Sequence, residues 1–207
     1  MLSQLSLLAE VVLVITTLFL LLNQNWRWNI IALSVQYLAV FTLVALVWPV
    51  GLAAVKLVAG WMAGAVLGAS QPPAELSEDP QSGGPAFIFR FMVAILIWVL
   101  VFTLGPALVK LMALPPALVT GAVLLIGMGL INLGMTTRPL RVLLGLLTTL
   151  SGFELLYAAV ESSVLVAGLL AVVTLGLALV GAYLLDTLSG EEEEAEADQT
   201  QQDGRQP

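Results

Sequence analysis

Long apolar segments separated by short polar or proline-containing turns follow one another along most of the chain. Each segment has about 20 residues, and at about 1.5 Å of rise per residue a helix of that length crosses the roughly 30 Å hydrocarbon core of a bilayer. The pattern predicts an all-α, polytopic transmembrane helix bundle of about seven spans, with six as the alternative count. The predicted spans are residues 5–22, 29–48, 50–69, 86–104, 116–135, 140–160 and 164–185.

The second and third segments are joined without a polar loop. Pro49 breaks the helix after Trp48, because proline lacks an amide hydrogen and disfavours helix in the residue before it. Residues 50–69 are long enough to cross the bilayer, yet they carry Lys56 and many small residues. We predict a separate third span. The alternatives are a kinked continuation of the second helix and a helix lying in the interface.

Two polar stretches divide the chain. Residues 70–85 hold four prolines, two glycines and three acids, which predicts an acidic loop between the N-terminal helices, residues 1–69, and the C-terminal helices, residues 86–186. From Ser189 onward the chain has no apolar residue larger than alanine. Such a sequence cannot bury enough apolar surface to fold, so residues 187–207 are predicted to form a disordered, acidic, cytoplasmic tail. Binding to a basic partner is the alternative role for this tail.

Composition identifies the solvent and excludes several functions. Hydrophobic residues make up 59% of the chain and charged residues only 10%, against about 25% charged residues in soluble domains, so the partner of most of the surface is the lipid bilayer. No basic cluster indicates a nucleic-acid partner. Cysteine and histidine are absent, and no phosphate-binding glycine loop occurs. We therefore predict no catalytic residues, no metal site and no cofactor, and a protein that is not an enzyme.

Charge also predicts the orientation in the membrane. No Lys or Arg precedes the first apolar run, which contains Glu10, so this run is predicted to be a retained span and not a cleaved signal. With seven spans, five arginines fall on one side and Lys110 on the other, and basic residues mark the cytoplasmic side. We expect a multi-pass protein of the plasma (inner) membrane with its N-terminus outside and its C-terminus in the cytoplasm. The five arginines are Arg27, Arg90, Arg138, Arg141 and Arg205.

Glu154 is the clearest candidate for chemistry, because it lies well inside the sixth predicted span. At 100° per residue, Ser151, Glu154, Tyr157 and Glu161 share one side of that helix, which predicts a hydrophilic face turned away from lipid. A carboxyl group in a low dielectric can hold a proton and exchange it, which suits a proton or cation pathway. The alternative is a structural acid that fixes helix packing, with Ser151 or Lys56 as its partner.

Other residues inside the spans have two interpretations each. Lys56 either extends to an interface or takes part in a buried ion pair or relay, and Glu161 is either part of the pathway or an interfacial residue. Gly60 and Gly64 form a small-xxx-small pattern that predicts close helix packing. Glu10 is predicted to be structural. Three residues can hydrogen-bond between helices: Gln36, Asn132 and Thr174.

The last three predicted spans, residues 116–186, resemble a family of small three-helix subunits. The features that carry this resemblance are an apolar span that ends in a basic turn at residues 135–141, and the triplet Gly152-Phe153-Glu154 in the next span. They are similar to the K (4L-type) subunit of respiratory complex I and its relatives in membrane-bound hydrogenases and cation/proton antiporters. The resemblance implies that Glu154 takes the place of a glutamate on a hydrophilic axis for protons. The third helix of complex I members carries a second glutamate, whereas residues 164–185 contain no acid, and residues 1–115 have no counterpart.

The favoured hypothesis is a non-catalytic membrane subunit of an ion-translocating complex, redox-driven or antiporter-like, with other membrane subunits as partners. A second hypothesis is a structural or assembly protein without transport. The third is a small self-contained transporter, although the two halves show no repeat of the kind common in such proteins.

Overall fold

The computed structural model describes residues 2–71 and 84–203, and only the backbone of residues 2–3, 84–86, 189 and 191–203. Most of the predicted acidic loop and the last four residues of the tail lie outside the described residues. Within the described part, the chain forms seven helices, each with a stretch long and apolar enough to cross a membrane. They are α1 (Leu2–Leu22), α2 (Trp26–Val44), α3 (Val50–Ala69), α4 (Gly84–Met112), α5 (Pro116–Gly134), α6 (Pro139–Val160) and α7 (Val164–Asp203).

These helices confirm the predicted all-α bundle, and the chain is a multi-pass membrane protein. Large apolar side chains cover its outer surface, as expected of a protein whose solvent is lipid. On α4, for example, Phe102 and Leu96 are about two-thirds exposed. The third segment is a helix of its own, packed lengthwise between α2 and α7, and this excludes a kinked continuation of α2.

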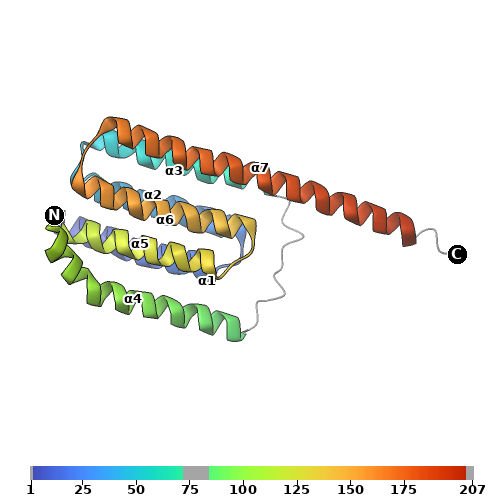
Figure 1. Ribbon diagram of the computed structural model, residues 1–207, viewed down its shortest axis with the longest axis horizontal. Coiled ribbons are helices and arrows are strands. Elements are labelled where there is room, and N and C mark those ends of the chain that lie inside the picture. Colours follow the sequence, from blue (N-terminus) through green and yellow to red (C-terminus); the bar gives the residue numbers. More distant parts are fainter. Residues whose placement is uncertain (1, 72–83, 204–207) are drawn as a thin grey trace.

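The helices form two packed rows (Figure 1). One row contains α4, α5, α6 and α7 in chain order, and the other contains α1, α2 and α3; α7 packs on α3, α6 on α2, and α5 on α1. Successive helices run in opposite directions. The start of α1 and the α2–α3, α4–α5 and α6–α7 turns therefore lie at one end, here called the N-terminal end. The α1–α2 and α5–α6 turns lie at the opposite, C-terminal end, where the Arg141 guanidinium donates to the carbonyl of Asn23 over 2.6 Å.

Glycines bring α5 and α6 unusually close together. A Cβ at Gly152 on α6 would lie 2.8 Å from the carbonyl oxygen of Ala122 on α5, and one at Gly145 would lie 3.1 Å from the carbonyl of Gly129. Only residues without a side chain allow two helix backbones to approach this closely. The contact fixes α6, which carries Glu154, firmly against the centre of the molecule.

An apolar core fills the C-terminal half of the space between α2, α3, α6 and α7. Its innermost members belong to one cluster and have no exposed surface. We call this cluster the leucine layer: Leu33, Ala63, Leu67, Leu144, Leu147 and Ala178.

The largest differences from the predicted helix ends concern three helices, α2, α4 and α7. α2 starts at Trp26 and not at residue 29, because the Asn25 side chain accepts the amide of Arg27 and caps the helix; it ends at Val44. α4 continues through Pro106 to Met112, whereas the predicted span ends at residue 104. Prolines are tolerated inside membrane helices because neighbouring groups compensate for the lost hydrogen bond, and α4 bends in its last turns in Figure 1.

The third difference concerns the tail. The sequence predicts disorder from residue 187, whereas α7 continues as a helix to Asp203 and extends beyond the bundle in Figure 1. Glutamate, alanine and glutamine favour helix, and residues 191–203 contain no glycine or proline. A preformed helix that leads into this segment also removes the cost of starting one.

Candidate functional site

The two charged side chains deepest in the bundle contact each other. Lys56 of α3 and Glu154 of α6 form an ion pair with 2.9 Å between Nζ and Oε2. Both residues are buried, with 3% and 2% of their surfaces exposed. Lys56 is six residues after the start of α3 and Glu154 is six residues before the end of α6, and both of these helix termini lie at the N-terminal end of the bundle. At about 1.5 Å per residue, the pair is therefore about 9 Å inside the bundle. Lys56 therefore takes the ion-pair role and does not extend to an interface.

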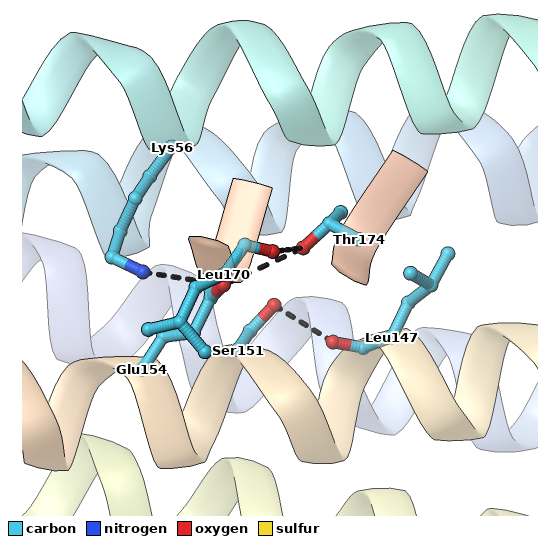
Figure 2. Close-up of polar contacts among 6 residues, drawn as sticks. All are labelled: Lys56, Leu147, Ser151, Glu154, Leu170 and Thr174. Atoms are coloured by element: carbon cyan, nitrogen blue, oxygen red, sulfur yellow. Dashed lines mark hydrogen bonds and ion pairs between the residues drawn. The ribbon is translucent and has the colours of Figure 1, made fainter. Parts of the chain in front are cut away.

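A third helix contributes a hydroxyl group to the pair. Thr174 of α7 donates from Oγ1 to Oε1 of Glu154 over 3.4 Å, and the same hydroxyl lies 3.0 Å from the carbonyl oxygen of Leu170 (Figure 2). The two carboxylate oxygens thus have different partners, an ammonium group on one and a hydroxyl group on the other. The site is held by α3 from the N-terminal half of the chain and by α6 and α7 from the C-terminal half.

Ser151 lies one turn from Glu154 and is buried, but its hydroxyl is used elsewhere. It donates to the carbonyl oxygen of Leu147 over 2.8 Å, as Figure 2 shows. The sequence left Ser151 and Lys56 open as partners of Glu154, and the structure shows Lys56 as the partner.

α2 adds two polar residues to the same region. The Tyr37 ring packs against Gly60, where there is no room for a side chain, and the hydroxyl lies beside Ser151 without a well-aligned hydrogen bond. Gln36 donates from Nε2 to the hydroxyl of Thr148 over 3.3 Å. Its Oε1 atom and the Tyr37 hydroxyl are among the few buried side-chain polar atoms in the described residues that lack a hydrogen-bond partner.

Two aromatic rings lie between the ion pair and the N-terminal end. Trp48, in the turn before α3, is 4% exposed, and its ring centroid is 6.0 Å from Lys56 Nζ. It meets Tyr157 edge to face, with 6.4 Å between centroids and 89° between planes. Its indole N–H donates to the carbonyl oxygen of Glu161 over 3.2 Å.

The predicted stripe on α6 is therefore only partly assembled into a site. Ser151 and Glu154 are buried and Tyr157 is half-buried. Glu161 is the extended residue that ends α6, and its side chain is exposed. Glu161 contacts the site through its backbone carbonyl, and its exposed side chain agrees with the interfacial interpretation of this residue.

The remaining candidates lie outside the pair. Gly60 and Gly64 are on the face of α3 that packs against α2. A Cβ at Gly64 would lie in van der Waals contact with the side chains of Ser34 and Ile30. Glu10 is half-buried on α1, and Asn132 is buried on α5. In the described residues no group of three or more Asp, Glu, His or Cys side chains could hold a metal ion.

Sequence reasoning missed Tyr37, Trp48 and Thr148 as neighbours of the pair. Gln36 and Tyr37 are two adjacent polar residues inside an apolar span, and this pattern can indicate a buried polar site. Trp48 gives no such signal, because a tryptophan next to a proline at a span end usually indicates a membrane interface.

Comparison with family models, with curated proteins and with solved structures gives no match. The chemical capability of the site must therefore be argued from its geometry. An acid and a base in contact inside a low-dielectric medium can exist as an ion pair or as a neutral pair, and one proton transfer converts one state into the other. Because the interaction energy changes steeply with the distance between charges there, small movements of α3 or α7 would shift this balance.

Proposed function

We propose that the chain is a non-catalytic membrane subunit of an ion-translocating assembly, in which the Lys56–Glu154 pair takes up and releases protons. The observation that carries this proposal is the burial of two charged side chains inside a membrane bundle, at 2.9 Å from each other. Ionisable residues inside a membrane are expensive, and they usually serve ion or proton pathways.

The pair favours protons over metal cations as the transported species. One carboxylate oxygen already contacts an ammonium group, and the other accepts from Thr174. A metal cation at Glu154 would have to displace Lys56 against charge repulsion. A proton needs no coordination shell and can be exchanged within the pair itself.

A subunit explains the surroundings of the pair better than a self-contained transporter does. Between the pair and the C-terminal end, the sequences of α2, α3, α6 and α7 contain no charged residue until Arg27, Arg141 and Asp186. Beyond Gln36, Tyr37, Thr148 and Ser151, the leucine layer fills the rest of that region. A proton on the pair would therefore continue sideways to a partner, in agreement with the resemblance of residues 116–186 to small subunits of proton-pumping complexes.

We place the N-terminal end outside and the C-terminal end in the cytoplasm of the plasma membrane. Three arginines support this orientation: Arg27 and Arg138 are at the ends of the turns on the C-terminal side, and Arg141 bridges those turns through Asn23. Basic residues favour the cytoplasmic side.

The structural or assembly role remains the second candidate, because the ion pair and Thr174 join α3, α6 and α7. Removing one partner of a buried ion pair is strongly destabilising, whereas replacing both by apolar residues is often neutral. A double replacement therefore separates a pair that only holds helices together from a pair that carries protons.

The test starts with purification of the tagged chain in mild detergent and identification of its partners. Proton translocation by the assembly is then measured in inverted membrane vesicles with a pH-sensitive dye. We expect Glu154→Gln and the double variant Lys56→Met/Glu154→Leu to lose most of the translocation while partners still co-purify. Glu10→Gln, which removes a half-buried acid on α1, is the matched control and should behave as the wild type.

Full translocation by the double variant in an intact assembly would contradict the proton role and favour the structural one. Purification of the chain without any partner would contradict its role as a subunit.

A further inference from the structure

The ion pair is much closer to one end of the bundle than to the other. About two helical turns separate it from the α2–α3 and α6–α7 turns at the N-terminal end. On the other side, the leucine layer and some 13 residues of α3 without a charged side chain, residues 57–69, follow Lys56. The shortest path from an end of the bundle to the pair therefore starts at the N-terminal end.

Trp48 occupies that short distance. Its ring faces Lys56 at 6.0 Å, packs on Tyr157, and is held by its hydrogen bond to the Glu161 carbonyl. Glu161 itself has an exposed side chain at this end, so the indole lies between the charged pair and the exposed surface.

The burial of Trp48 is unusual for a tryptophan at the end of a span. Trp28, near the start of α2, is 56% exposed, as expected for a ring that anchors a protein among lipid head groups. Trp48 is only 4% exposed and points inward, over the ammonium group. An anchor has no need of that position.

We propose that Trp48 is the gate of a one-sided entrance through which water and protons reach the Lys56–Glu154 pair from the N-terminal end. The role of the gate rests on the proposed proton function, whereas the access of solvent to the pair does not depend on it. Release of a single hydrogen bond, from the indole to Glu161, and rotation of the ring open the gate. A hydronium ion then transfers one proton to the Glu154 carboxylate and leaves a water molecule, and Lys56 keeps its charge.

Access can be measured directly, because the chain contains no cysteine. Ala53 and Ala63 are both fully buried on α3, Ala53 between Lys56 and the N-terminal end and Ala63 in the leucine layer. Ala53→Cys therefore reports on the entrance, and Ala63→Cys is the matched control on the dry side. The probe is a small, membrane-impermeant methanethiosulfonate, applied to sealed vesicles from either side.

We expect Ala53→Cys to react slowly when Trp48 is intact. With Trp48→Ala its rate should rise by about tenfold or more, which corresponds to a barrier lower by about 1.4 kcal/mol, and only from the N-terminal side. Trp48→Phe keeps a ring but removes the indole N–H, and it should raise the rate by a smaller factor. Ala63→Cys should stay unreactive from both sides in every background.

Equal reactivity of Ala53→Cys with Trp48 intact and with Trp48→Phe, in protein that elutes as a folded particle, would overturn the gate even if Trp48→Ala fails to fold. Reaction from the C-terminal side would overturn the one-sided entrance. Neither result depends on translocation. Conversely, a Trp48-controlled entrance together with full pumping by the Glu154 variants would leave the gate standing and remove the proposed proton role.

Discussion

The Lys56–Glu154 contact shows what a membrane bundle must supply in order to bury a charged side chain. Taking each charge out of water costs several kcal/mol, and only the close opposite charge and additional hydrogen bonds offset this cost. Here Glu154 has the ammonium group and the Thr174 hydroxyl, whereas the other hydrogens of Lys56 Nζ have no hydrogen-bond partner among the described residues. The lysine is thus less well satisfied than the glutamate.

The burial of the pair leads to a prediction for stability. Lys56→Met should lower the free energy of unfolding by about 3–5 kcal/mol, because it leaves an unpaired buried carboxylate. Adding Glu154→Leu should recover most of that loss. Unfolding in mixed micelles with increasing dodecyl sulfate, followed by circular dichroism, measures both changes.

The control is Lys110→Met, which removes an exposed lysine in the last turn of α4 and should change the free energy of unfolding by no more than about 0.5 kcal/mol. If the single Lys56 variant were no more destabilised than this control, the ion pair would contribute nothing to the fold.

At this scale the sequence predicts the acid but not its full environment. Glu154 stands out because an acid well inside an apolar span needs a reason to be there. Lys56 could be paired or interfacial, since nothing in a single sequence says that α3 packs against α7 and faces α6. The contribution of Thr174 to the same carboxylate depends on the same three-dimensional arrangement.

Among the helices, α5 and α6 set the geometry of the site by their close approach. An added Cβ at Gly152 meets backbone atoms of α5, the Ala122 carbonyl at 2.8 Å and the Ile126 amide nitrogen at 2.9 Å, which cannot move without moving the helix. On α7, Gly176 has nothing within 4 Å of the same position. The two glycines are thus a matched pair, one inside a helix contact and one outside.

We expect Gly152→Ala to destabilise the protein by about 1–3 kcal/mol, the usual cost of forcing extra volume into a packed core. Gly176→Ala should be neutral or stabilising by up to about 1 kcal/mol, since alanine favours helix more than glycine does. Thermal unfolding in detergent compares the two. A lower midpoint for Gly176→Ala than for Gly152→Ala would contradict the close α5–α6 contact.

The element boundaries were predictable where local chemistry decides them and not elsewhere. Pro49 and Pro115 precede α3 and α5 as expected of a residue that starts a helix. Pro106, in contrast, lies inside α4 and does not mark a helix end. In a bilayer no water is present to bond the backbone groups of a broken helix, so the chain stays helical past the proline. α7 runs past its expected end because acidic residues exclude a hydrophobic core but not a helix.

For the molecule as a whole, the number of spans follows from the hydrophobic pattern, but the arrangement in two rows does not. Hydrophobicity says that a helix is in lipid and leaves open which helix lies beside it. The site is formed by α2, α3, α6 and α7, which come from both halves of the chain and meet only through this arrangement. The orientation across the membrane is a property of the whole molecule too, and it can be tested with single cysteines.

Single-cysteine labelling tests both the orientation and the seven-span count, because the chain has no cysteine of its own. Ser162→Cys in the α6–α7 turn should react with an impermeant maleimide on intact cells. Thr137→Cys in the α5–α6 turn and Gln24→Cys in the α1–α2 turn should react only after permeabilisation, because basic residues such as the arginines at that end favour the cytoplasmic side. The reverse pattern would invert the orientation. Gln24→Cys and Thr137→Cys on opposite sides would mean that one of the four helices between them, α3 above all, does not cross the membrane, and the pair it carries would then lie at the interface.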